Sequence, residues 1–184
     1  MPERPCLDAA LEYRARGWSV MPLCPPDHHR CSETHVHSCA APGKRPLCNW
    51  RELQARLPRE SELILWWTRW PTANVALILG SLSRLVGFDI DGPESEDLLL
   101  ERFPGVAWEP TLEFKTPGGG RRILYATPPG LVVPRRRWDR GLSHVILLGE
   151  GSYSVMPPSV HPLGVPYQWT TTTSSRTPNR PPTS

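Results

Sequence analysis

The N-terminal part of the chain has apolar positions at helical spacing in two segments, which predicts helices over residues 7–16 and 60–70. A short apolar run over residues 18–23 predicts a strand between them. The residues that follow this strand, 24–49, are polar and rich in Cys, His and Pro. A loop of that length inside a compact domain is usually functional or held together by a metal, so this segment is a candidate site.

The rest of the chain consists mainly of short β-prone runs, with one helix predicted over residues 93–103. Two of these runs, 74–79 and 84–90, are separated by Gly80 and Ser81, a spacing typical of a hairpin. The remaining predicted strands cover residues 111–116, 121–126, 145–148, 152–156 and 167–170, and the first two of these are joined by a glycine-rich turn. Strands interleaved with few helices favour an α+β fold, with an antiparallel or mixed sheet and helices on one side.

The composition is that of one globular domain. The chain has 184 residues, of which 39% are hydrophobic and 21% charged, which is enough for a single core. We expect the domain to span residues 1–170. The low-complexity residues 171–184 are expected to be a disordered tail or a linker. The formal net charge of +3 permits a nucleic-acid partner without requiring one.

The cysteine content favours a reducing compartment. There are five cysteines, and an odd number argues against a closed disulfide framework. The N-terminal segment carries charged residues where a secretory signal would be apolar, and no apolar run approaches the length of a membrane span. We therefore expect a cytoplasmic protein with no membrane partner, in which clustered Cys and His bind a metal.

An acidic pair ends the apolar run Leu85-Val86-Gly87-Phe88-Asp89-Ile90-Asp91. Strand alternation puts Asp89 and Asp91 on one face and Ile90 on the other. Two carboxylates on one rigid face can hold Mg²⁺ and leave positions open for phosphate oxygens, which is the minimum for nucleotidyl transfer. The alternative is a strand end capped by solvated acids.

A glycine-rich turn precedes two arginines in Thr116-Pro117-Gly118-Gly119-Gly120-Arg121-Arg122. Gly119 and Gly120 would let the backbone approach a ligand closely, and Arg121 and Arg122 could bind phosphate. The turn is neither a P-loop nor a dinucleotide fingerprint, because no Gly-Lys-Ser/Thr follows and a strand rather than a helix comes next. The alternative is a wide hairpin loop with solvated arginines.

The polar loop contains three Cys and four His within residues 24–39. The pairs Cys24/His28 and His35/Cys39 have the spacing of a closed tetrahedral zinc site, which would be structural and would hold a loop that has little core of its own. Cys31 and His37 are rival ligands. The alternative is a flexible loop with incidental histidines.

Four segments taken together resemble the bifunctional primase–polymerase domains of the archaeo-eukaryotic primase superfamily. The similarity covers roughly residues 7–170. In family order, these segments are Pro42–Leu47 with Trp50, residues 74–80 with 85–94, residues 116–125, and residues 149–164 with Tyr167 and Trp169.

The resemblance implies a split-RRM-like primase core with a Cys/His zinc-binding insertion. It also implies DNA primase or polymerase activity that uses NTPs or dNTPs, template DNA and Mg²⁺ or Mn²⁺. Asp89 and Asp91 would be the metal ligands. The setting would be a plasmid, a phage or another mobile element, with a replicative helicase in cis or in trans.

Two positions depart from the family pattern. A histidine of the second motif corresponds to Arg122, which can still bind a triphosphate but cannot act as a neutral imidazole. A third acidic position corresponds to Ile146, which cannot bind a metal. The nearest acid is Glu150, about 13 Å further along an extended strand.

Further candidates lie outside these motifs. Ser159 and His161 resemble nucleotide-contacting positions of the family. The candidates for DNA binding combine positive charge with one aromatic ring. They are Lys44, Arg45, Arg135, Arg136, Arg137 and Trp138.

The sequence leaves three hypotheses for function. The first is a primase–polymerase-type nucleotidyltransferase with Asp89, Asp91 and Arg122 as catalytic residues. The second is a catalytically degenerate domain that binds nucleotide or DNA, which Arg122 and Ile146 motivate. The third is a zinc-stabilised DNA-binding module in which the acidic pair is only structural.

Overall fold

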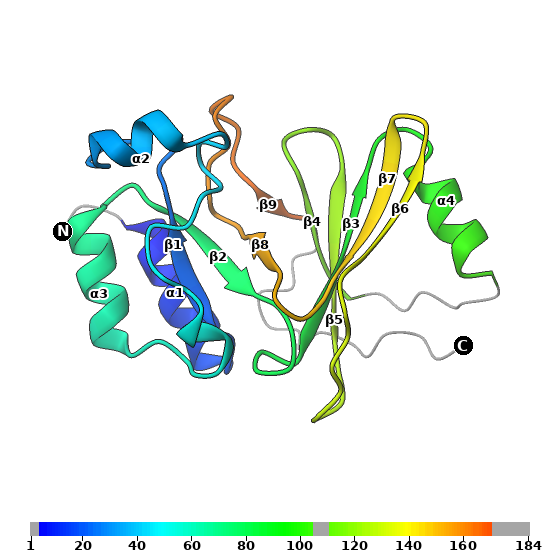
Figure 1. The fold of residues 1–184 in the computed structure, drawn as a ribbon, viewed down its shortest axis with the longest axis horizontal. Helices are drawn as coiled ribbons and strands as arrows, with labels where there is room; N and C mark the ends of the chain where they lie inside the picture. Colours follow the sequence, from blue (N-terminus) through cyan, green and yellow to red (C-terminus); the bar gives the residue numbers. More distant parts are fainter. Residues whose placement is uncertain (1–3, 105–110, 171–184) are drawn as a thin grey trace. The chain divides into compact units, whose positions relative to one another are not determined.

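The structure is a computed structural model that describes residues 4–104 and 111–170. The chain divides into two compact units, the first made of residues 1–78 and 153–167 and the second of residues 79–152 and 168–184. Both combine helices with antiparallel strands (Figure 1), which confirms the α+β prediction. The tail predicted over 171–184 lies outside the described residues, and the domain boundary at 170 stays a prediction. No helix within the described ranges is long and apolar enough to cross a membrane.

The elements follow the hydrophobic pattern closely. The helices are α1 (Pro5–Ala15), α2 (Glu33–Ser38), the 3₁₀ turn η1 (Glu52–Gln54), α3 (Glu60–Arg69) and α4 (Ser95–Arg102). The strands are β1 (Val20–Leu23), β2 (Asn74–Ile78), β3 (Leu85–Asp91), β4 (Leu112–Lys115), β5 (Arg121–Ala126), β6 (Arg136–Arg140), β7 (Ser143–Leu148), β8 (Tyr153–Val155) and β9 (Gln168–Trp169).

The first unit contains a three-stranded antiparallel sheet in the order β1-β2-β8, and α1 and α3 pack beside it (Figure 1). Trp67 is fully buried in α3, and its indole N–H donates to the Ala73 carbonyl at 3.0 Å. The Tyr13 hydroxyl on α1 donates to the Pro157 carbonyl at 2.6 Å. Buried aromatic rings whose polar atoms are hydrogen-bonded therefore fasten both helices to this unit.

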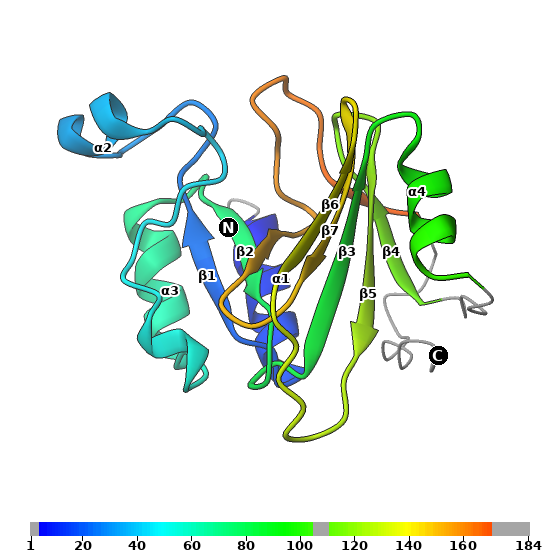
Figure 2. The same cartoon turned by 45° about the vertical axis from the view of Figure 1, so that its right-hand side comes forward.

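The second unit contains a six-stranded antiparallel sheet in the order β6-β7-β3-β5-β4-β9. Helix α4 lies along one face of it, as Figure 2 shows from a second direction. The core beneath α4 takes alternate residues of the strands together with two leucines of the helix. Its members are Val86, Phe88, Ile90, Leu98, Leu99, Ile123, Tyr125 and Val145.

The hairpin predicted between residues 74–79 and 84–90 is wrong. Strands β2 and β3 belong to different sheets, and they are joined only by a bridge between Gly80 and Leu85. Gly80 has a φ of +122°, and a Cβ there would lie 2.6 Å from a carboxylate oxygen of Glu150. The pairing between the two apolar runs ends at this tight glycine turn. Each run therefore pairs with other strands.

Two further segments differ from the sequence prediction. The polar loop over residues 24–49 contains the short helix α2, whose N-terminus is capped by the Ser32 hydroxyl. Residues 136–140, which include three of the DNA-binding candidates and for which no strand was predicted, form the edge strand β6. Charged side chains are common on edge strands because they discourage pairing with other chains, and here they mask the alternation that predicts a strand.

Candidate functional site

The acidic pair lies on β3, which is central in the six-stranded sheet between β5 and β7. Phe88 and Ile90 are buried toward α4, whereas Asp89 and Asp91 are half-buried and therefore lie on the opposite face. The alternation expected from the sequence is thus confirmed. The sheet holds both carboxylates on a backbone that is hydrogen-bonded on both sides.

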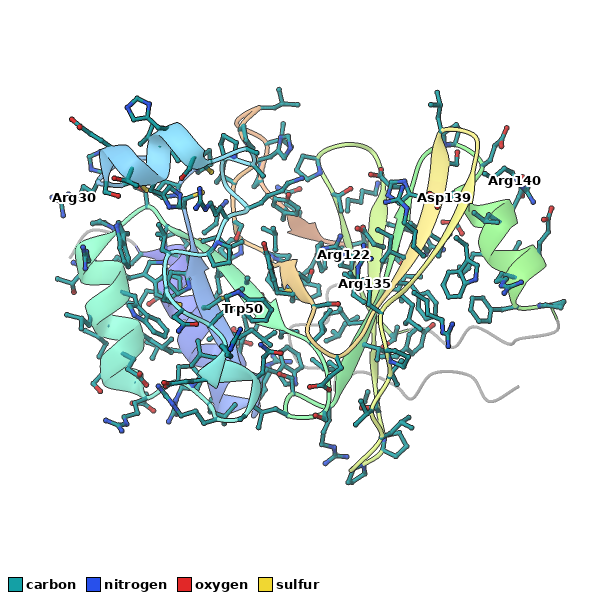
Figure 3. The ribbon with its side chains drawn as sticks, in the orientation of Figure 1. Arg30, Trp50, Arg122, Arg135, Asp139 and Arg140 are labelled. Atoms are coloured by element: carbon teal, nitrogen blue, oxygen red, sulfur yellow. The ribbon has the colours of Figure 1, made fainter. Side chains whose placement is uncertain are left out.

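Arg122 lies directly opposite Asp89 on β5, and its Nη2 forms an ion pair with Asp89 Oδ1. Figure 3 labels Arg122 on this strand. Arg122 is only 9% exposed, and its guanidinium lies 6.0 Å from the centre of the Phe114 ring. Because few water molecules reach the pair, the attraction between the two charges is stronger than at a solvated surface. The second-motif arginine therefore places a cation beside the first carboxylate.

Ile146 lies opposite Asp89 on the other side, on β7, and is buried. Its side chain has no atom that could bind a metal on the face of the sheet that carries Asp89 and Asp91, which we call the acidic face. The carboxylate of Glu150, the nearest acid along the chain, instead accepts a hydrogen bond from the Ser81 backbone N–H at 2.8 Å. Asp89 is consequently flanked by one arginine and one aliphatic side chain.

The glycine-rich turn joins β4 and β5 and directs its two arginines to opposite faces. Arg121 lies toward α4 and pairs with Glu96 at 2.5 Å and with Glu113 at 2.8 Å. These carboxylates, Glu96 first, raise the pKa of the Arg121 guanidinium. A Cβ on Gly120 would lie 2.8 Å from Asp91 Oδ1, so the turn passes close to the second carboxylate.

An open pocket of about 360 Å³ adjoins this turn on the α4 side. It includes Gly119, Gly120 and Arg121, and it also takes in Glu96, Glu113 and Lys115. Two acidic side chains already neutralise Arg121, so a phosphate group would have to compete with them. Arg122 is paired too, with Asp89, but it lies opposite that residue in the sheet and so shares a face with the acidic pair.

Replacing Arg122 by Met should lower the free energy of unfolding by about 3 kcal/mol, because it leaves the partly buried carboxylate of Asp89 without its cation. The measurement is urea denaturation. Adding Asp89→Asn to this variant should restore much of the loss, since no uncompensated charge is then left.

The matched control is Arg121→Met, in which a more exposed guanidinium loses its partners Glu96 and Glu113. Exposed pairs contribute little, so this change should cost no more than about 1 kcal/mol. Equal losses at Arg121 and Arg122 would contradict the claim that burial strengthens the Arg122 pair.

The Cys/His segment brings four of its side chains together in the first unit. The ligand atoms of Cys24, His28, His35 and Cys39 all lie within 4.8 Å of one another, so the group could hold a metal ion. The Cys24 and Cys39 sulfur atoms are 3.9 Å apart, close to the roughly 3.8 Å that two thiolates adopt on a tetrahedral zinc ion. The rivals Cys31 and His37 are not members of this group.

The electrostatics of this group also suit a metal. The Nε2 atoms of His28 and His35 are buried without a hydrogen-bond partner, which is costly unless an ion binds them. Burial, and then the charge of Arg45, lowers the pKa of His35, which favours the neutral imidazole that a metal binds. The Cys24 thiol is different, because burial raises its pKa and so disfavours the thiolate that a metal would bind.

The other nucleotide-site candidates belong to the first unit. Ser159 is fully buried, and its hydroxyl donates to the Val75 carbonyl and accepts from the Val75 N–H. His161 is half-buried, and its Nδ1 accepts from the Leu163 N–H at 3.3 Å. Lys44 is exposed, while the Arg45 guanidinium donates to the Ser38 hydroxyl at 2.7 Å. Nucleotide or DNA contacts by these residues stay predictions.

The basic segment, residues 135–138, begins one residue before the edge strand β6 and continues along it (Figure 3). Arg135, Arg136 and Arg137 are exposed, so their charges are available to a polyanion. Trp138 is half-buried against the α4 core, with its ring 5.4 Å from that of Phe103. Its contribution to the structure is therefore packing, and DNA binding by this segment stays a prediction.

Sequence analysis missed His144, which shares the face of the acidic pair. It lies opposite Asp91 on β7, two positions before Ile146. Strand alternation alone puts residues 144 and 146 on the same face, so the signal was present in the sequence. The family motifs point only to the second of these positions.

Comparison with known proteins gives one result on family membership. No curated protein matches the chain. The family model for the bifunctional DNA primase/polymerase N-terminal domain matches residues 10–184, nearly the whole chain. This range includes the acidic strand, the glycine-rich turn and the Cys/His group, and the chain therefore belongs to the bifunctional DNA primase/polymerase N-terminal family.

Proposed function

We propose that the chain catalyses template-dependent nucleotidyl transfer, binding NTPs or dNTPs and template DNA on a split-RRM-like primase core. The observation that carries the proposal is that Asp89 and Asp91 share one face of β3 with Arg122. The chain also belongs to a family of primase–polymerase domains. The setting we propose is replication of a plasmid or phage, where a replicative helicase in cis or in trans would supply single-stranded template.

In this proposal Arg122 binds the triphosphate, because a guanidinium can form paired hydrogen bonds with phosphate oxygens. The exposed arginines of β6 would attract template DNA by charge. The donor set on β3 fits a hard divalent ion in part: Asp91 offers a half-buried carboxylate, while Asp89 is already paired with Arg122. When bound, Mg²⁺ or Mn²⁺ would neutralise negative charge on the transferring phosphoryl group.

We also propose that the group of Cys24, His28, His35 and Cys39 holds zinc in a structural role. Four nitrogen and sulfur ligands close a tetrahedral site and leave no position for substrate. The ion would hold α2, which lacks buried residues of its own.

A second candidate function is a binding domain without catalysis. Ile146 opposite Asp89 and the arginine paired with Asp89 favour it, because both reduce the capacity of the Asp89 carboxylate to bind a metal ion. Such a domain would bind a nucleotide through Arg122 and leave synthesis to another protein.

The deciding experiment is incorporation of labelled dNTPs and NTPs on a primed and on an unprimed template, with Mg²⁺ and with Mn²⁺. The proposal expects products whose sequence follows the template. Nucleotide binding without any incorporation under these conditions would overturn it and support the second candidate.

A further inference from the structure

A second row of polar side chains crosses the sheet next to the row of Asp89. Asp91 on β3 lies opposite His144 on β7, and His144 lies opposite Asp139 on β6. Figure 3 labels Asp139 on β6. Directly paired residues of an antiparallel sheet share a face, and Asp91 shares one with Asp89 by alternation. The acidic face therefore has two consecutive rows, Arg122–Asp89–Ile146 and Asp91–His144–Asp139.

The first row is poorly suited to a divalent ion. The Arg122 guanidinium already neutralises Asp89, and both side chains are mostly shielded from solvent. A second cation at Asp89 would be repelled strongly in such surroundings. The opposite neighbour, Ile146, has no donor atom with which to offset that repulsion.

The second row has the donors that the first lacks. The Asp91 carboxylate and the His144 imidazole form no recorded hydrogen bond or ion pair with other described residues. The Cβ atoms of residues directly opposite each other lie about 4.5–5.5 Å apart, so their side chains can converge on one ion. Asp139, which pairs with Arg137 through one oxygen at 2.7 Å, could accept from the other imidazole nitrogen with its second oxygen and so orient the ring.

We propose that Asp91 and His144 form a divalent-metal site, displaced by one row from the position of the missing acid. The inference rests on the proposed function for its role in nucleotidyl transfer, whereas metal binding itself can be measured without nucleotide. Because an imidazole nitrogen suits transition metals better than Mg²⁺, the site selects Mn²⁺ over Mg²⁺.

The test is Mn²⁺ binding to the zinc-loaded full chain without nucleotide, followed by electron paramagnetic resonance. We expect about one bound Mn²⁺ per chain whose pulsed spectrum shows coupling to a ¹⁴N nucleus. His144→Ala should weaken binding by at least about tenfold and remove that coupling. His144→Asp should keep the ion and lose only the coupling, because a carboxylate oxygen replaces the nitrogen.

The controls are His29→Ala, an exposed histidine outside the Cys/His group, and Ile146→Val, a conservative change on the same face of β7. Neither should alter the affinity or the ¹⁴N coupling. If bound Mn²⁺ in the wild-type chain lacks nitrogen coupling, or if no Mn²⁺ binds, the proposal is wrong. This spectrum keeps the test decisive even where His144→Ala fails to fold.

Failure of this site and failure of the proposed function give different results. Absence of incorporation with Mn²⁺ bound through His144 would refute nucleotidyl transfer and leave the metal site standing. Incorporation by a chain whose Mn²⁺ binding is unaffected by His144→Ala would do the reverse.

Discussion

Replacing Asp89 and Asp91 together by Asn should lower template-dependent incorporation by at least about 10³-fold, because the site then loses the negative charge that holds the metal and positions Arg122, and with it several kcal/mol of transition-state stabilisation. The measurement is the initial rate with Mn²⁺ at saturating dNTP. Both side chains belong to one face of β3, so the change removes negative charge from a single site.

The two positions are expected to differ in stability, which allows chemistry to be separated from folding. Asp89→Asn weakens the contact with buried Arg122 and should lower Tm, whereas Asp91 has no recorded ion pair among the described residues. Asp91→Asn is therefore the cleaner test of catalysis. Loss of incorporation in this variant with an unchanged Tm assigns a role to the carboxylate itself.

The matched control is Asp97→Asn, an exposed acid in the first turn of α4. It should leave incorporation unchanged, because α4 packs on the face of the sheet opposite Asp89 and Asp91. Wild-type rates in the Asp89→Asn and Asp91→Asn double variant would show that the acidic pair is structural. Unchanged nucleotide and metal binding in that variant would favour a zinc-stabilised DNA-binding module.

The acidic strand was predictable because its signal is local. An apolar run that alternates with Asp89 and Asp91 specifies which side chains share a face before any partner strand is known. The same holds for β4 and β5, where a short glycine-rich turn joins two runs that pair directly. Both predictions needed only the period of the strand and the chemistry of the turn.

The choice of partner strands was not local and could not be predicted in the same way. The sequence around Gly80 has the spacing of a hairpin, yet β2 pairs with β1 and β8 while β3 pairs with β5 and β7. Alternation fixes the face of a side chain and leaves open which strand lies beside it. The ion pair between Asp89 and Arg122 depends on that register, and so does the row that contains His144.

The Cys/His group was predictable for a different reason. Cys24 with His28 and His35 with Cys39 are each close in sequence, so most of the geometry is set by two short segments. His35 and His37 both lie on α2, and residues two apart on a helix do not face the same side, which accounts for the absence of His37 from the group. Cys31 lies outside the group as well.

Replacing Cys39 by Ser should reduce zinc content from about one equivalent per chain to below about 0.2, because loss of a thiolate should weaken the site by more than about 100-fold. The segment around α2 should then become sensitive to proteases, since this helix has no buried residues to hold it in place. The measurements are zinc content by mass spectrometry of the purified chain and limited proteolysis with mapping of the cleavage sites.

The matched controls are Cys31→Ser and His37→Ala, which alter the same segment outside the four-residue group. Both should keep about one zinc and resist cleavage as the wild-type chain does. Zinc loss in either control together with retention in Cys39→Ser would show that the ligand set is misassigned. A wild-type chain with less than about 0.2 equivalents of zinc would exclude a structural zinc site, for which binding is coupled to folding.

Because the second unit contains none of the four ligands, its Arg122–Asp89 pair should survive zinc removal, and the stability cost of Arg122→Met should persist in Cys39→Ser.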